Sequence, residues 1–348
     1  MKRPKSGNKP TLKTIAKELG LGVTTVSRAL RNDEKISAET RKIVHETARR
    51  LSYHPSRAGL RLRTGKTNAI GLVIDTEEQA GSFVSDLIFG ISDVLEKTPY
   101  HLFVMPYSRL SDPVAPIRYL VETESVDGIL ITRIEPNDAR VEYLLANDMP
   151  FVTRGRTQMG IEHPYHDFDN EAFARLAVRR LAELGRQRIA LLAPPANLSF
   201  HDHLNHGFHA ALEEHGIDEF PLPALTSDSA FEEVRRHVRQ VMQRTDRPDG
   251  IVNTAGGLSG AGGVLLTLLA AIHDAGLTPG RDVDIVTMQQ FASLPFLREQ
   301  IHVIQEDVRE AGRALATSLM GAIDREPTSQ LQSLMVPNDV LLAEPVGP

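Results

Sequence analysis

Hydrophobic positions near the N-terminus recur at helical spacing in three short segments. The first spans Leu12–Leu19, with Thr11 as its N-cap, and Gly20 ends it. The second covers residues 23–31, and the third follows Ser37, which is a good N-cap. A helix, a short glycine turn, a second helix and a supporting helix form the helix-turn-helix pattern, so we expect that fold here.

Each predicted helix has one apolar stripe that packs against the others. The stripes consist of Ile15, Ala16 and Leu19, then Val26 and Leu30, then Ile43, Val44, Thr47, Ala48 and Leu51. The second helix exposes short polar side chains on its other face. Such side chains let a helix enter the major groove of DNA, and Arg28 is the best candidate for a bidentate contact to guanine. The alternative interpretation is an ordinary capped surface helix.

From Ala69 onward, short apolar strands alternate with helices, which indicates parallel sheets. The segments VDGILIT and PDGIVNT look like the same step in two lobes, so we expect an α/β body of two doubly wound parallel-sheet lobes with a ligand cleft between them. Strands are expected at residues 69–74, 101–106, 127–132, 150–153, 188–193, 249–254 and 284–289, and helices at 84–97, 171–184, 205–215, 231–243 and 261–275.

The segment HPSRAGLRLRTGKT separates these regions and is typical of a linker with weak helical potential. We therefore divide the chain into a helix-turn-helix head at residues 1–54, a linker at 55–66 and a two-lobed body at 67–348. The charge follows this division. Residues 1–66 hold 17 Lys and Arg against 5 Asp and Glu, and the remaining residues hold 22 against 40. A basic head on an acidic body favours a nucleic-acid-binding module over a solvated basic tail.

Composition excludes several classes of function. The chain has no cysteine, which excludes disulfides, zinc-thiolate sites and cysteine nucleophiles and fits a reducing compartment. No apolar run approaches the roughly 18 residues of a membrane span, and the basic start MKRPKSGNKPTLK has no apolar core of a secretory signal behind it. We expect a cytoplasmic, nucleoid-associated protein with no membrane partner.

The head carries a family resemblance. The stretch from TLKTIAKELGLGVTTVSRAL to TNAIGLV is similar to the N-terminal signature of the lactose-repressor (LacI/GalR) family, and the match continues in FDNEAFARLAVRRLAELGRQRIALLAPP and GFHAALEEHGI. The resemblance implies a head that binds a palindromic operator as a homodimer. It also implies a periplasmic-binding-protein-like body that holds a small effector between its lobes, without cofactor or enzymatic activity.

The resemblance assigns DNA contacts residue by residue. Val23 and Thr24 fall at the positions that usually choose the operator sequence, and residues 56–63 resemble the hinge helix that folds on the operator. Leu62 matches a leucine wedge in the minor groove. Gly59 replaces the usual alanine and costs a helix about 1 kcal/mol. This cost either makes operator binding more sensitive to the effector or is offset by the DNA contacts. The DNA-binding positions are Thr11, Leu12, Val23, Thr24, Thr25, Ser27, Arg28, Ser37, Thr40, Tyr53, Ser56, Gly59 and Leu62.

The resemblance also implies an effector site. A sugar pocket needs planar polar groups that fork onto hydroxyl pairs and an aromatic face against the ring, and Arg156 could grip hydroxyls or an anion. Three departures from the family pattern occur: Leu204 replaces an arginine, Ala255 and Gly256 replace an Asn-Asp pair, and Gln289 and Gln290 replace an Asp pair. The effector-binding positions are Ser82, Phe83, Arg156, Asp169, His203, Asn205, Gln289 and Glu306.

The segments TMQQ and QEDVREAGR are similar to the α-glucoside-operon regulators of that family, so a disaccharide is the leading effector. The alternatives are a phosphorylated or non-sugar effector, including a purine, that acts as corepressor. HDHLNHGFH holds four histidines, but no carboxylate-histidine spacing defines a metal site. GGLSGAGG lacks the Lys-Ser/Thr of a P-loop.

Two other classes compete with a repressor. A sugar-binding transport protein shares the body but needs a signal peptide where this chain has a basic head. An enzyme fused to a DNA-binding head lacks a nucleophile-base pair, a metal set or a P-loop here. The body of a repressor should dimerise to place two heads on two half-sites, and no C-terminal heptad helix follows Pro337, which favours a dimer over a tetramer.

Overall fold

A computed structural model describes residues 10–53, 65–75, 81–108, 111–222, 225–254, 263–288, 301–338 and 341–343. The chain forms two compact units, Met1–Thr67 and Asn68–Pro348, which we call the head and the body. No helix in the described part of the chain is both long and apolar enough to cross a membrane.

The head contains the three predicted helices, α1 (Leu12–Leu19), α2 (Val23–Ala29) and α3 (Ala38–Arg50). Both predicted N-caps are confirmed. The hydroxyl of Thr11 accepts a hydrogen bond from the Thr14 amide at 3.3 Å, and that of Ser37 accepts one from the Thr40 amide at 3.1 Å. Gly20 ends α1 in the left-handed conformation, with φ of 63°.

The core of the head is small and comes from all three helices. Its buried members are Ile15, Ala16, Val26, Ala29, Val44 and Ala48. The prediction for Ile43 was wrong: its side chain is 42% exposed. The stripe of α3 follows positions 44, 47, 48 and 51, and Ile43 precedes that stripe by one residue, about 100° around the helix.

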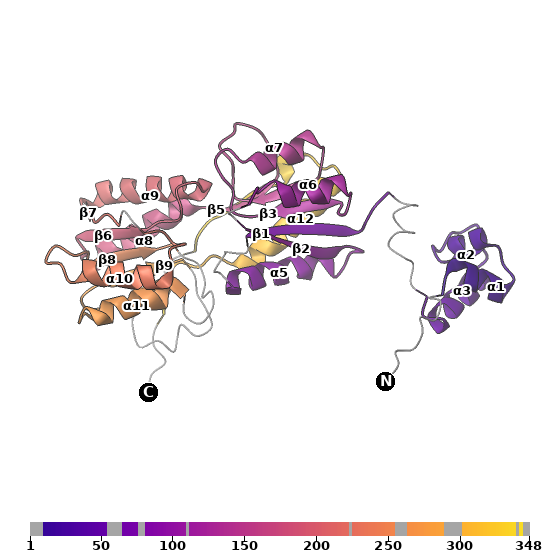
Figure 1. The fold of residues 1–348 in the computed structure, drawn as a ribbon, viewed down its shortest axis with the longest axis horizontal. Helices are drawn as coiled ribbons and strands as arrows, with labels where there is room; N and C mark the ends of the chain where they lie inside the picture. The colour runs from indigo at the N-terminus through magenta and orange to yellow at the C-terminus, as the bar shows by residue number, and fades with distance from the viewer. Residues whose placement is uncertain are drawn as a thin grey trace. The chain divides into compact units, whose positions relative to one another are not determined.

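The first lobe of the body, the N-lobe, is a parallel sheet in the order β11-β5-β4-β3-β1-β2 (Figure 1). Helices α5 and α12 cover one face and α6 and α7 the other. The elements are β1 (Ala69–Asp75), α5 (Gly81–Leu95), β2 (His101–Tyr107), α6 (Ala115–Glu122), β3 (Gly128–Ile131), α7 (Ala139–Ala146), β4 (Phe151–Arg154), β5 (Tyr165–Phe168), α12 (Val308–Ile323) and β11 (Gln332–Met335).

The second lobe, the C-lobe, repeats the plan with the order β12-β10-β9-β8-β6-β7, in which β12 pairs antiparallel. Helices α8 and α9 cover one face, and α10 and α11 the other (Figure 1). The elements are α8 (Asn170–Glu183), β6 (Arg188–Leu192), α9 (Ser199–His215), β7 (Asp218–Glu219), α10 (Phe231–Met242), β8 (Gly250–Asn253), α11 (Gly263–Asp274), β9 (Asp284–Thr287), β10 (Ile301–Val303) and β12 (Leu341–Ala343).

The two doubly wound lobes confirm the predicted fold class, but the chain crosses between them in a way that the sequence pattern missed. Helix α12 follows β10 of the C-lobe yet packs on the N-lobe against α5. The helices meet at glycines: a Cβ on Gly90 would lie 2.0 Å from the Arg309 carbonyl oxygen, and one on Gly312 would lie 2.4 Å from that of Leu87. The chain therefore returns to its first sheet after the second is almost complete.

Candidate functional site

The exposed face of α2 carries the predicted base-reading residues. The Val23 side chain is 40% exposed and Thr24 is exposed, while Thr25 and Ser27 are half-buried. Arg28 donates from Nε to Asp33 Oδ2 at 2.8 Å. This hydrogen bond, together with one from the Lys35 amide, lowers the pKa of Asp33 to about 2. The ion pair holds the Arg28 side chain through its Nε atom.

The other predicted DNA-binding residues of the head flank this helix, and several of them cap helices. Thr11 and Thr40 take part in the N-caps of α1 and α3, and Ser37 Oγ lies 2.7 Å from Thr40 Oγ1. Leu12 and Tyr53 are half-buried against the core of the head. A helix N-terminus presents free amides, which suits a phosphate. The predicted positions Ser56, Gly59 and Leu62 lie outside the described residues.

The first cluster in the body joins two predicted effector residues through an arginine. Phe83 of α5 is 7% exposed, and the guanidinium carbon of Arg154 lies 4.4 Å from the centroid of its ring. Arg154 is also ion-paired with Glu306. Sequence reasoning missed Arg154, although its place at the end of β4 marks the carboxyl edge of the sheet, where ligands bind in such folds.

The second cluster combines Arg156, the arginine predicted for the effector site, with a histidine from α9. Arg156 donates from Nε to Asp167 Oδ2 at 2.7 Å. Burial, and then the charge of Arg156, lower the pKa of His203, which favours the neutral form of the imidazole. The Nδ1 atom of His203 and the Nε atom of Arg154 are buried and have no hydrogen-bond partner among the described residues. Buried polar atoms of this kind are suited to a polar ligand.

Other predicted effector residues have local structural roles. Asp169 is the N-cap of α8 and accepts a hydrogen bond from the Ala172 amide at 2.9 Å. The Asn205 amide donates to the His201 carbonyl oxygen, also at 2.9 Å. Leu204 is fully buried in the core of the C-lobe. Gln289 and the Ser82 side chain lie outside the described residues, as do Ala255, Gly256 and Gln290.

The four histidines of HDHLNHGFH do not converge. Helix α9 begins at Ser199, six residues before its predicted start, so the histidines point to different neighbours. His206 lies 3.7 Å from Glu171, and His209 lies 3.2 Å from Glu219. The described residues contain no group of three or more His, Cys, Asp or Glu that could hold a metal ion.

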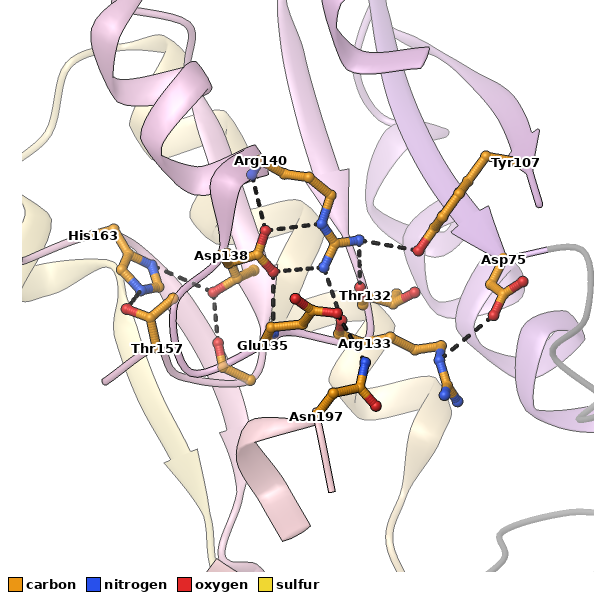
Figure 2. Close-up of polar contacts among 12 residues, drawn as sticks. Asp75, Tyr107, Thr132, Arg133, Glu135, Asp138, Arg140, Thr157, His163 and Asn197 are labelled. Carbon is orange, nitrogen blue, oxygen red and sulfur yellow. Dashed lines mark hydrogen bonds and ion pairs between the residues drawn. The ribbon is translucent and has the colours of Figure 1, made fainter. Parts of the chain in front are cut away.

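The loop after β3 adds a third arginine to the carboxyl edge (Figure 2). Arg133 Nε lies 3.6 Å from Oδ2 of Asp75, and Arg133 Nη2 lies 2.5 Å from Oδ2 of Asp228 in the C-lobe. Asp75 and Arg133 were not predicted as site residues. Both come directly after predicted strands, and that position was the signal that could have found them.

This architecture defines a DNA-binding head joined to a periplasmic-binding-protein-like body. Residues 11–56 match the model for bacterial regulatory proteins of the lacI family, and residues 67–339 match that for periplasmic binding proteins and the sugar-binding domain of the LacI family. The chain belongs to the LacI family and is a DNA-binding transcriptional regulator, not an enzyme.

Several individual proteins and solved structures are similar to this chain. The chain is 33% identical over 324 residues to the HTH-type transcriptional regulator AglR of Rhizobium meliloti, covering 90% of this chain and 87% of AglR. It is 37% identical over 220 residues to RafR of Escherichia coli, covering 62% and 65%. The lac repressor dimer bound to operator and the anti-inducer ONPF shares the fold, with a TM-score of 0.80, 20% identity and coverage of 98% and 100%. The CelR-cellobiose complex has a TM-score of 0.67 at 22% identity, with coverage of 95% and 98%.

Proposed function

We propose that this protein represses carbohydrate-utilisation genes and leaves its operator when a neutral oligosaccharide, with an α-linked disaccharide first, binds between the lobes. The main observation behind the proposal concerns the arginines at the carboxyl edge of the N-lobe sheet. Every described arginine there is paired with a carboxylate. Arg133, Arg154 and Arg156 face four acids, namely Asp75, Asp228, Glu306 and Asp167.

This charge balance argues against an anionic effector. Each guanidinium is already neutralised, and the group carries one more carboxylate than arginines, so a phosphate would meet net negative charge. Hydroxyl groups can instead donate to carboxylates and accept from guanidinium groups. A corepressor with a phosphate or a purine remains the second candidate, and Arg156 is the residue that would grip it.

In the proposed mechanism, α2 enters the major groove, where Val23 and Thr24 choose the operator sequence and Arg28 contacts guanine. Ser56, Gly59 and Leu62 belong to the proposed hinge of residues 55–66, which orders on the operator, and Leu62 acts as a wedge in the minor groove. The head then comprises residues 1–54 and the effector-binding body residues 67–348. Such a protein acts in the cytoplasm, at the nucleoid.

A homodimer is supported by the edge of the N-lobe sheet. Strand β2 is one of the two edge strands of this sheet and exposes Phe103 and Val104. Phe89 of α5 and Tyr119 of α6, the helices beside β2, are 54% and 56% exposed. An apolar surface along an unpaired edge strand is a place where a second copy of the chain can pack. Two copies would present two heads to the half-sites of a palindrome.

Thermal unfolding of the full chain tests the effector class. We expect stabilisation by α-linked disaccharides such as maltose, trehalose or melibiose and none by glucose 6-phosphate or purines. A ligand at 100 times its Kd adds about 2.7 kcal/mol to the free energy of unfolding, which shifts the melting temperature visibly. Stabilisation by the phosphorylated sugar or the purine alone would overturn the effector assignment and support the corepressor alternative.

A further inference from the structure

The loop between β3 and α7, residues 132–138, is one part of the N-lobe that contacts the C-lobe (Figure 2). Gln158, which donates to Asp202 Oδ2 at 3.0 Å, is another. Three interactions join this loop to the C-lobe through side chains and backbone. They are the ion pair of Arg133 with Asp228 at 2.5 Å, the hydrogen bond from the Ser199 amide to the Ile134 carbonyl oxygen at 2.9 Å, and that from Asn197 Nδ2 to Glu135 Oε1 at 2.8 Å.

The loop is anchored to its own lobe by a buried arginine. Arg140 is 3% exposed and donates to both carboxylate oxygens of Asp138, at 2.9 and 2.6 Å. Its Nη1 atom donates to the carbonyl oxygen of Thr132 at 3.1 Å, and Nη2, which also contacts Asp138, donates to that of Arg133 at 2.7 Å. Arg133 itself has φ of 55°, a conformation that needs surrounding structure to hold it. The loop therefore presents a fixed surface to the C-lobe.

The ion pair across the lobes is poorly solvated. The side chains of Arg133 and Asp228 are 13% and 19% exposed, and the Asp75 side chain behind Arg133 is fully buried. Attraction between such groups is stronger than between surface charges. Asp75 belongs to the same lobe as Arg133. Separation of the lobes would therefore break the ion pair of Arg133 with Asp228 and keep its ion pair with Asp75.

We propose that Arg133 and Asp228 form an interlobe latch that holds the lobes closed and thereby sets the apparent affinity for the effector. The inference rests on the proposed function in one respect, that the effector binds between the lobes. An effector that contacts both lobes prefers the closed arrangement, so its apparent Kd equals its intrinsic Kd divided by the fraction of closed molecules. Arg133 and Asp228 act as positioning residues in this scheme.

The variant Asp228→Asn tests the latch because it removes the charge in the C-lobe and leaves the pair of Arg133 with Asp75 intact. The matched control is Asp148→Asn, which breaks the pair of Asp148 with Arg325 at 2.6 Å, a pair that lies within the N-lobe. The readout is hydrogen exchange of the Ser199 amide in the full-length protein, resolved by fragmentation of the peptide 196–203. This amide is hydrogen-bonded across the lobes, so its exchange reports their separation.

We expect the Ser199 amide to exchange hydrogen about tenfold faster in Asp228→Asn than in the unaltered protein. In Asp148→Asn we expect the unaltered exchange rate. An unchanged rate in Asp228→Asn, or an equal rise in the control, would overturn the latch. Asn197→Ala removes a single interlobe hydrogen bond, the one to the Glu135 carboxylate, and should accelerate exchange of the Ser199 amide more weakly. It serves as the second variant if Asp228→Asn does not fold.

A second readout separates this inference from the proposed function. With maltose, trehalose and melibiose as probes, Asp228→Asn should need about tenfold more of the active sugar for half-maximal thermal stabilisation, and Asp148→Asn should not. If none of these sugars stabilises any variant, the proposed effector fails, while the exchange at Ser199 still decides the latch. If one does, and both variants need equal amounts of it, the link between latch and effector affinity is overturned.

Discussion

At the scale of single residues, the recurring arrangement is an arginine held by a carboxylate. Asp33 fixes Arg28 on the recognition helix, Glu306 pairs with Arg154 beside Phe83, and Asp138 holds Arg140 in the interior. A paired guanidinium loses less conformational freedom when it binds a ligand, because its position is already set. Two of these pairs, those of Arg28 and Glu306, join a residue that was singled out from the sequence to a partner that was not.

Arg28→Ala should remove specific operator binding. A bidentate contact to guanine contributes about 1–3 kcal/mol of discrimination, so the preference for operator over scrambled DNA should fall by about 5- to 150-fold. Asp33→Asn should cause a smaller loss, because it removes the charge that orients Arg28. Fluorescence anisotropy with both DNA sequences measures the ratio. Retained specificity in Arg28→Ala would contradict the assigned role of α2.

His166 should make the body less stable in acid. Burial, and then the charge of Arg154, lower the pKa of this histidine from its usual 6.5 to about 4. The unfolded chain therefore binds a proton below about pH 6.5, whereas the folded chain does so only near pH 4, and the free energy of unfolding falls across this window as the pH falls. In His166→Gln, the free energy of unfolding should depend less on pH between pH 6.5 and 5. Urea unfolding at several pH values measures the slope, and an unchanged slope in this variant would count against the buried neutral histidine.

At the scale of elements, the long apolar strands and strongly amphipathic helices could be predicted, and the crossovers could not. The predicted strands at 69–74 and 188–193 match β1 and β6 to within one residue. The sequence pattern missed α6 and α7, and α12 follows β10 of the C-lobe in the chain. Its place against α5 depends on contacts distant in sequence, which local periodicity does not encode.

Gly312→Ala should destabilise the N-lobe. The added methyl group would lie 2.4 Å from the Leu87 carbonyl oxygen, so α5 and α12 would have to separate. Overpacking of this kind costs about 1–3 kcal/mol. Urea unfolding gives the loss directly, and Ser92→Ala on the exposed part of α5 is the control. Equal stability of the two variants would show that the helices do not pack this closely.

At the scale of the whole molecule, regulation requires that the two heads of a dimer respond to the proposed effector site in each body. The basic head is attracted to DNA, and the acidic body is repelled by it, so the charge directs the head to the operator. Dimerisation places two weakly binding heads on one operator, and an effector that favours one lobe arrangement changes how well both heads fit. A typical coupling between effector and operator is about 1–3 kcal/mol.

Phe103→Glu should separate the proposed dimer. The substitution places a charge on the exposed edge strand, which disfavours packing of a second copy. We expect a monomer in analytical ultracentrifugation, a large loss of operator affinity and unchanged stabilisation by the effector. Lys97→Glu, another exposed position of the N-lobe, is the control for added negative charge. A dimer that persists in Phe103→Glu would place the interface elsewhere.

The most direct test of the account is selection of DNA by the full-length protein from a random pool, followed by competition with effectors on the selected sequence. The account predicts that a palindrome is enriched and that an α-linked disaccharide releases it, while glucose 6-phosphate and purines do not. Enrichment of a palindrome that tightens with a phosphorylated sugar or a purine would contradict the inducer mechanism. Failure to enrich any palindrome would contradict the dimeric repressor itself.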